Sequence, residues 1–159
     1  MTGFVPVDIP TKKYIKAYVL SKLGKQPVMN TETNIGSKLY DLLQHQTNER
    51  KNQFCSSHYT ELLRIYIPVR TFRRRGSFLN ESNTKNFNIF LERELKNNFY
   101  EQMNMLILFF PSFENNLPEV RKRLGIDIEA WSDDSMKKDY YRYRKRMGVR
   151  LFYSKQSMP

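Results

Sequence analysis

The sequence predicts an α+β protein that is mostly helical and has a small β-sheet. Several stretches repeat apolar residues every three or four positions, which is the spacing of an amphipathic helix. One stretch, residues 60–70, alternates in the manner of a β-strand. The chain of 159 residues suits one domain, or one core with a small appendage, and aromatic residues, at 14%, supply large side chains for that core.

The N-terminal third is expected to hold one extended segment and two helices. Residues 4–9 form a short extended segment whose prolines argue against a central position in a sheet. Thr11 is expected to cap a helix over residues 12–23. A shorter helix is expected over about residues 36–45, and the polar stretch 44–57 predicts a mobile loop.

Residues 60–70 form the clearest strand of the sequence. One face of this strand is fully apolar and carries Leu63, Ile65, Ile67 and Val69. Pro68 indicates an edge strand or the end of a strand, because proline donates no backbone hydrogen bond. The arginine-rich residues 72–76 are expected to form a basic turn after the strand.

The longest predicted helix spans residues 84–110, capped by Asn83 and ended by Pro111. At 1.5 Å per residue it is roughly 40 Å long, so we expect it to be the backbone of the fold. Its final residues, 106–110, are apolar on all sides, which predicts that they are buried somewhere, either within the chain or between subunits. Its apolar row comprises Phe87, Phe90 or Leu91, Leu95, Phe99, Met103, Leu106 and Phe110.

The C-terminal part is expected to contain two further helices. A short helix over residues 117–124 ends at Gly125, and a last helix over about residues 134–147 is capped by Ser132 or Asp133. Residues 149–153 are expected to form a small final strand. We therefore predict two parts: residues 1–112 as a mixed helical and small-sheet core, and residues 113–159 as a basic module packed on it.

The charge of the chain favours a polyanionic partner. The net charge is +11 and the pI is near 9.8, which predicts nucleic acid as the partner. No apolar run is long enough to span a membrane, so no membrane partner is expected. A single cysteine, Cys55, and the lack of an apolar signal segment indicate a cytoplasmic location.

The final helix carries the predicted binding surface. Met136, Tyr140, Tyr143 and Met147 share one face, which we expect to pack inward. The remaining surface is cationic with one aromatic residue, and such residues contact phosphates and base edges. We predict that the DNA-binding residues of this helix are Lys137, Lys138, Tyr141, Arg142, Arg144, Lys145 and Arg146.

The order of short helix, turn and basic helix over residues 117–146 resembles a helix-turn-helix module. It is similar to the trihelical DNA-binding ends of bacteriophage and mobile-element proteins, including Mor-type transcription activators. Gly125 matches the tight-turn glycine of that family, while Arg121 stands where a small residue is usual. The resemblance implies a DNA-binding regulator of transcription or replication in a phage or mobile element.

A second basic cluster lies in the middle of the sequence. Arg64 and Arg70 are expected on the polar face of the strand, and Arg73, Arg74 and Arg75 in the basic turn. Arginine binds phosphate through two parallel hydrogen bonds, so this cluster is a candidate second phosphate-contact site or wing-like element. A solvent-facing strand with a solubilising turn explains the same residues equally well.

The sequence carries no catalytic or metal-binding signature. His45, His58 and Cys55 supply one possible ligand pair and no second pair, so we expect no metal and no cofactor. Asp133 and Asp134 are interpreted as residues of a helix start, and we expect no enzymatic activity. Two alternatives to DNA binding stay open. One is an RNA-binding protein, and the other is a structural or assembly protein, or a homodimer, that self-associates through the long helix.

Overall fold

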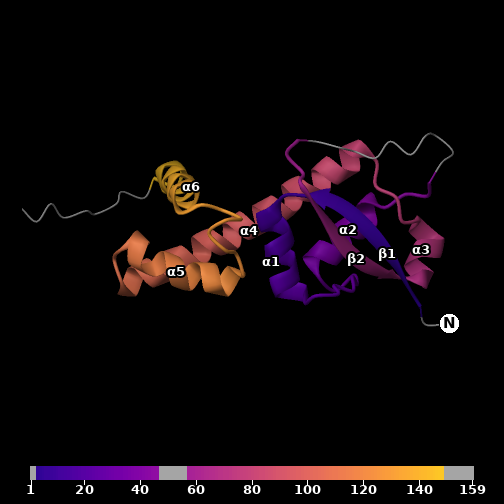
Figure 1. Ribbon diagram of the computed structural model, residues 1–159, viewed down its shortest axis with the longest axis horizontal. Helices are drawn as coiled ribbons and strands as arrows, with labels where there is room; N and C mark the ends of the chain where they lie inside the picture. Colours follow the sequence, from indigo (N-terminus) through magenta and orange to yellow (C-terminus); the bar gives the residue numbers. More distant parts are fainter. Residues whose placement is uncertain (1–2, 47–56, 149–159) are drawn as a thin grey trace, which may run out of the picture.

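The computed structural model describes residues 3–46 and 57–148. Within these residues, two strands and six helices form a mostly helical α+β fold, which confirms the predicted class (Figure 1). The elements are β1 (Phe4–Thr11), α1 (Lys13–Leu23), α2 (Asn34–Leu42), β2 (Glu61–Pro68), α3 (Val69–Arg75), α4 (Glu81–Phe109), α5 (Phe113–Leu124) and α6 (Asp133–Arg146).

The sheet consists of β1 and β2, which pair antiparallel from Phe4 opposite Pro68 to Thr11 opposite Glu61. Each strand is therefore an edge, where prolines are tolerated. The predicted apolar face of β2 is confirmed, because Leu63, Ile65 and Ile67 are fully buried. The extended segment predicted at residues 4–9 is the first part of β1.

Thr11 does not cap a helix, so that prediction is wrong. It ends β1, and its hydroxyl donates a 2.6 Å hydrogen bond to Oδ1 of Asn88 on α4. Asn88 in turn donates to the carbonyl of Pro10 at 2.8 Å. Thr11 and Asn88 are both buried, and buried polar side chains need hydrogen-bond partners. The hydroxyl of Thr11 therefore bonds to Asn88 and does not cap a helix. This contact fastens the sheet to α4, and α1 begins after Lys12 without a side-chain cap.

The expected basic turn is a helix. Val69 leaves the strand and begins α3, which continues to Arg75. The last hydrogen bond along this strand pairing is donated by the backbone N–H of Val69 to the carbonyl of Gly3, at 3.0 Å. The residues that follow have no partner strand among the described residues and form hydrogen bonds within a helix instead. Arg70 therefore does not share a strand face with Arg64, which contradicts the predicted arrangement of the second cluster.

Helix α4 is the backbone of the fold, as expected. It begins at Glu81 and is capped by Asn80, whose side chain accepts from the backbone N–H of Asn83; the predicted cap, Asn83, lies inside the helix. The sheet and α1 to α3 lie along its N-terminal half, while α5 and α6 lie along its C-terminal half (Figure 1). The core residues of α4 are fully buried: Phe87, Leu91, Leu95, Phe99 and Met103.

The two parts of the chain share one buried apolar cluster. Ser21 of α1 donates a 2.8 Å hydrogen bond to the carbonyl of Leu124 at the end of α5. The rings of Tyr14 and Trp131 stack with their centroids 5.4 Å apart. The predicted division after residue 112 falls in the turn between α4 and α5, and the core continues across it.

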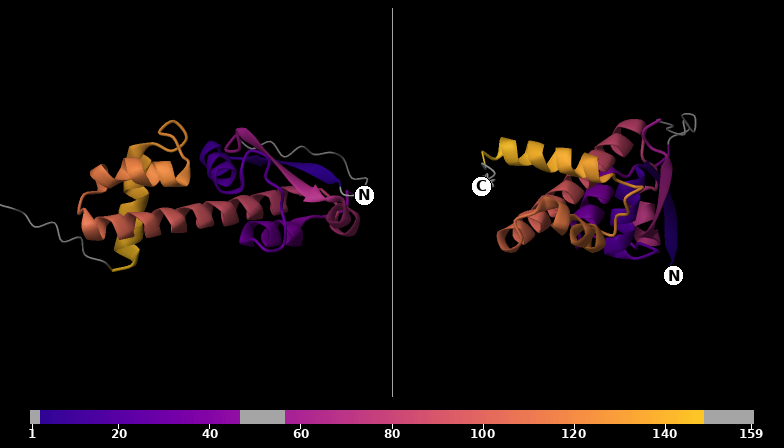
Figure 2. Two further views of the ribbon diagram at one scale, coloured as in Figure 1. Left: turned by 90° about the horizontal axis from the view of Figure 1, so that it is seen from below. Right: turned by 60° about the vertical axis from the view of Figure 1, so that its left-hand side comes forward.

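One expected burial at the C-terminal side is wrong, and another is not found within a single chain. Met147 is 62% exposed although Met136 and Tyr140 on the same predicted face are fully buried, because the end of α6 extends past the helices it packs on (Figure 2). Residues 106–110 end α4 at the extremity of the molecule, where Phe109 and Phe110 lie exposed. The predicted strand 149–153 and most of the predicted loop 44–57 lie outside the described residues.

Candidate nucleic-acid interface

Aromatic rings hold α6 crosswise on α4 and α5 (Figure 2). Tyr140 packs between Phe99 of α4 and Phe113 of α5, with ring centroids 6.0 and 5.5 Å away. Tyr143 stacks on Tyr100 of α4 with centroids 4.0 Å apart and ring planes 9° from parallel. Aromatic pairs prefer stacked or edge-on geometries, so these contacts fix the orientation of α6 on α4 and α5 as well as burying apolar area.

A chain of polar contacts also holds α6 in this position on α4. Asp139 of α6 accepts from the hydroxyl of Tyr100 at 2.5 Å and from Lys96 at 3.1 Å. Lys96 also pairs with Glu92 at 3.3 Å, and Glu92 accepts from Lys12 at 2.8 Å. Alternating charges thus connect the start of α1 to α4 and α6.

The electrostatics of these contacts favour the charged form of Glu92. Burial pushes the pKa of Glu92 upward, but the hydrogen bond and charge of Lys12, with help from Lys96, outweigh it and leave that pKa below its ordinary value. Burial and the hydrogen bond to Asp139 raise the pKa of Tyr100, so its hydroxyl stays protonated and donates. Glu92 and Asp139 thus form their ion pairs and hydrogen bonds with residues of the protein itself.

An open groove lies between α4 and α6. Its volume is about 890 Å³, and both helices contribute side chains to its walls. The charged lining residues are Glu92, Arg93, Lys96, Asp139, Arg142, Lys145 and Arg146, beside Ile89, Asn97 and Tyr100. Five cations and two carboxylates leave a formal surplus of three positive charges (5 − 2 = 3).

Four of the groove cations are available to an outside ligand. Arg93 of α4 and Arg142, Lys145 and Arg146 of α6 are exposed. None of these four forms an ion pair or hydrogen bond to another side chain within residues 3–46 and 57–148. Cations without internal partners give up no native interaction when they bind phosphate, so they are the strongest candidates for ligand contact.

The predicted DNA-binding residues of α6 differ in whether they already have partners within the protein. Lys138 is exposed on the outer surface, close in sequence to the groove residues. Lys137 instead pairs with Glu114 of α5 and lies 5.9 Å from the ring centroid of Tyr141. Arg144 donates to the hydroxyl of Tyr140 at 3.2 Å. Lys137 therefore helps to hold α6 against α5, whereas the contact of Arg144 lies within α6.

Sequence reasoning missed Arg93 and Lys96, because they lie on the helix that the apolar pattern marked as core. Ile89, Arg93, Lys96 and Tyr100 share one face of α4, at spacings of three and four residues. That pattern was visible in the sequence. Only the docking of α6 beside Tyr100 shows that this face is part of a groove.

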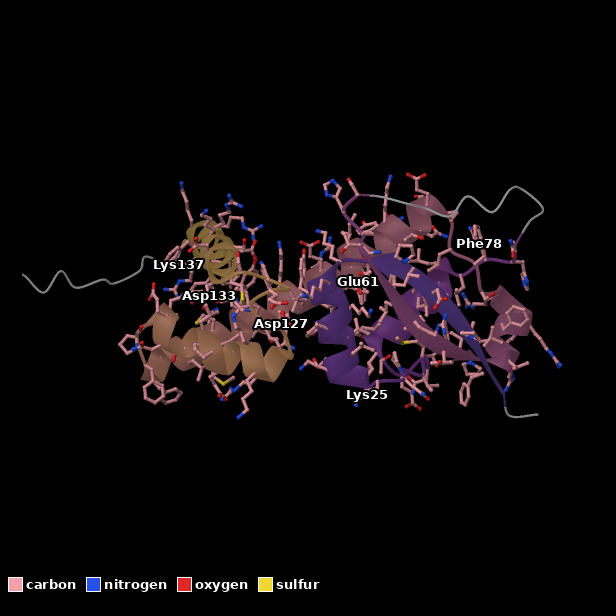
Figure 3. All side chains as sticks on the ribbon, viewed as in Figure 1. Lys25, Glu61, Phe78, Asp127, Asp133 and Lys137 are labelled. Carbon is pink, nitrogen blue, oxygen red and sulfur yellow. The ribbon has the colours of Figure 1, made fainter. Side chains whose placement is uncertain are left out.

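The second basic cluster lies far from α6. Figure 3 shows Lys137 on α6 in one half of the molecule and Phe78, shortly after α3, at the other end. Arg73 and Arg74 are exposed on α3. Arg75 donates to the carbonyl of Tyr40 at 2.9 Å, so it holds α2 to α3.

Arg64, another residue of the predicted second cluster, forms an ion pair within the sheet. It binds both carboxylate oxygens of Asp8, at 2.7 and 2.8 Å. Cation-bearing residues of α3 and β2 therefore do not flank the α4–α6 groove, and the structure does not bring the two predicted clusters together.

The link between α5 and α6 is fastened by Arg121. Its guanidinium donates to the carbonyls of Asp127 and Trp131, at 3.0 and 2.5 Å, and pairs with Asp133 at 2.5 Å. Gly125 ends α5 with φ of 67°, in the left-handed region. Arg121 thus ties the link, residues 125–132, to the start of α6.

Comparison of the chain with protein-family models, curated proteins and solved structures found no match. Among the described residues, no helix combines the length and the apolar character needed to cross a membrane. In the same residues no three His, Cys, Asp or Glu side chains gather in a way that suits a metal ion, and Cys55 lies outside them. The resemblance to Mor-type activators stays a prediction.

Proposed function

We propose that the protein binds duplex DNA through the α4–α6 groove and the outer surface of α6. The observation that supports this most is the set of cations without internal partners that two crossing helices present to one side. The resemblance of residues 117–146 supports a regulator of transcription or replication in a phage or mobile element. No catalytic step is proposed.

The charges of the groove suit a phosphate backbone. Arg93 stands on one wall and Arg142 on the other, so a phosphate strand entering between them meets guanidinium groups from two directions. Guanidinium groups bind phosphate through two parallel hydrogen bonds, and each neutralised phosphate releases condensed counterions. The net charge of +11 attracts DNA to the protein before contact is made.

The shape of α6 favours DNA over RNA. The C-terminal end of α6 projects past α4 (Figure 2), and its exposed residues Arg142, Lys145 and Arg146 are basic. A helix with its side chains is about 10–12 Å wide, and the major groove of B-form DNA is about 12 Å wide. The major groove of A-form RNA is deep and narrow and does not admit a helix. If one of the cations of α6 contacts a base instead of a phosphate, Arg142 is our choice, because its guanidinium fork can pair with guanine and it lies mid-helix.

Measurement of DNA affinity against salt concentration tests the proposal. If four to six phosphates are neutralised, log K falls with log salt with a slope of about −4 to −5. The triple variant Lys138→Ala, Arg142→Ala, Lys145→Ala is expected to bind more weakly at unchanged stability. Its slope is expected to be smaller by about one unit for each phosphate that the variant no longer neutralises.

A matched control removes the same charge elsewhere. Lys22, Lys25 and Lys122 are exposed cations outside α6, its groove and the second basic cluster. Their triple Ala variant is expected to keep an affinity close to that of the parent. Equal weakening of both variants, or no binding at about 50 mM salt, would overturn the proposal. Stronger competition by structured RNA than by duplex DNA would favour the RNA alternative.

A further inference from the structure

A cluster of large apolar side chains lies exposed where α4 ends. We call it the apolar tip. It comprises Met105, Leu108, Phe109 and Phe110, which are 52%, 82%, 74% and 64% exposed. A single exposed apolar residue is ordinary, but four on consecutive turns of one helix end form a contiguous patch.

The apolar tip is also the part of the chain with the least charge. No Lys, Arg, Asp or Glu occurs between Glu101 and Glu114, although the chain as a whole carries +11. Two copies of such a protein repel each other over most of their surface. The side chains of the apolar tip add no charge of their own to this repulsion. A contact between two copies through the tip therefore brings no like charges of residues 102–113 together.

The size of the patch fits a small dimer interface. Its four side chains expose on the order of 500 Å², given that one aromatic residue buries 150–250 Å². Half-buried Leu106 and Ile107 adjoin it. A standard interface covers about 800 Å² on each partner, so the patch alone corresponds to an interface at the small end of the range.

We propose that the apolar tip is the contact surface for a second copy of this chain. The same patch on both copies is self-complementary, so a two-fold axis through it closes the assembly as a dimer. Phe109 and Phe110 of each copy then pack against those of the other and leave water. This proposal does not depend on DNA binding.

The position of the apolar tip has a consequence that does rest on the proposed function. Tyr100, on which α6 is seated, lies nine residues before the end of α4 (109 − 100 = 9), or about 14 Å along the helix. Two copies meeting end to end therefore separate the positions of their α6 helices by at least about 27 Å. One turn of B-form DNA spans about 34–36 Å, so this spacing is of the order that two helices need to reach successive major grooves on one side of a duplex.

Sedimentation equilibrium of the full chain tests the dimer without DNA. The parent is expected to have twice the 19.1 kDa mass of one chain at about 50 µM, within the micromolar range of small interfaces. Phe109→Glu places two like charges at the centre of the contact and is expected to weaken the dimer at least tenfold. Ile128→Glu, which changes a residue that is 58% exposed on the α5–α6 link, is the control and is expected to remain dimeric.

The outcomes separate the two proposals. A monomeric parent, or a dimer that Phe109→Glu leaves intact while circular dichroism shows an unchanged fold, overturns the dimer. Random-site selection on duplex DNA is expected to yield inverted half-sites with centres about 10 base pairs apart. A confirmed dimer that selects no DNA contradicts the proposed function alone, whereas selection of a single half-site by a monomer contradicts the dimer alone.

Discussion

Replacement of Phe99 by alanine is expected to destabilise the whole molecule, because this ring joins three elements. Phe99 is fully buried in the C-terminal half of α4. Its ring lies edge-on to Trp131 of the α5–α6 link and to Tyr140 of α6, with centroid distances of 5.3 and 6.0 Å. Its removal opens a cavity at the point where α4, α6 and the link meet.

The magnitude follows from burial and ring contacts. A buried Phe→Ala change costs about 3–5 kcal/mol, and each aromatic pair adds about 0.5–1.5 kcal/mol beyond the area it buries. With two such pairs, the cost is expected at the upper end, about 4–5 kcal/mol. For a chain of this size each kcal/mol lowers the Tm by about 2–4 °C, so a decrease of about 8–20 °C is expected.

Phe109 supplies a matched control on the same helix. Phe109→Ala makes the same chemical change at a ring that is 74% exposed, so it is expected to change stability by less than about 0.5 kcal/mol. Both variants are compared by thermal unfolding at a dilution at which the chain is monomeric. Equal Tm values for the two variants would refute the assignment of Phe99 to the core and of Phe109 to the surface.

Two further predictions concern pH and backbone geometry. The pKa of Glu92 is lower in the fold than its ordinary 4.5, so its contribution to stability is present above that value and is lost as the pH falls through the lowered pKa. Tm measured against pH is therefore expected to fall less steeply in acid for Glu92→Gln than for the parent, and equal acid slopes would contradict this. Gly125→Ala is expected to cost more than Gly24→Ala in urea unfolding, because a Cβ at Gly125 would lie 2.3 Å from Cβ of Ser21, whereas Gly24 has nothing within 4 Å. Both glycines have positive φ, so equal costs would show that the contact with Ser21 is not limiting.

The parts of the fold that follow from local periodicity were predictable. The alternation of Leu63, Ile65 and Ile67 identified both the strand and its buried face. The spacing of apolar residues identified α4, and Gly125 marked the end of α5. In these places the local pattern and the tertiary environment favour the same structure.

The errors occur where tertiary partners decide. Thr11 has the chemistry of a helix cap, but its buried partner, Asn88, is 77 residues away in sequence. Residues 69–75 form a helix because the partner strand ends, which no local pattern reveals. Arg93 could not be assigned to a binding surface because the groove exists only once α6 lies across α4. Phe109 is exposed because the end of α4 extends past the helices that pack on it, which the sequence pattern does not show.

Two carboxylates in a groove proposed to bind DNA need a physical account, because they repel phosphate. Glu92 and Asp139 are both held by Lys96, and Glu92 also by Lys12. Their negative charge is therefore balanced before any ligand arrives, and they leave Arg93 and Arg142 unpaired. Without Asp139, Tyr100 and Lys96 would lose their hydrogen bonds to α6, and the two walls of the groove would be held by the aromatic contacts and Asn104 without this ionic contact. The acidic groups thus act as positioning residues, which explains how a cationic groove keeps a defined shape despite the mutual repulsion of its cations.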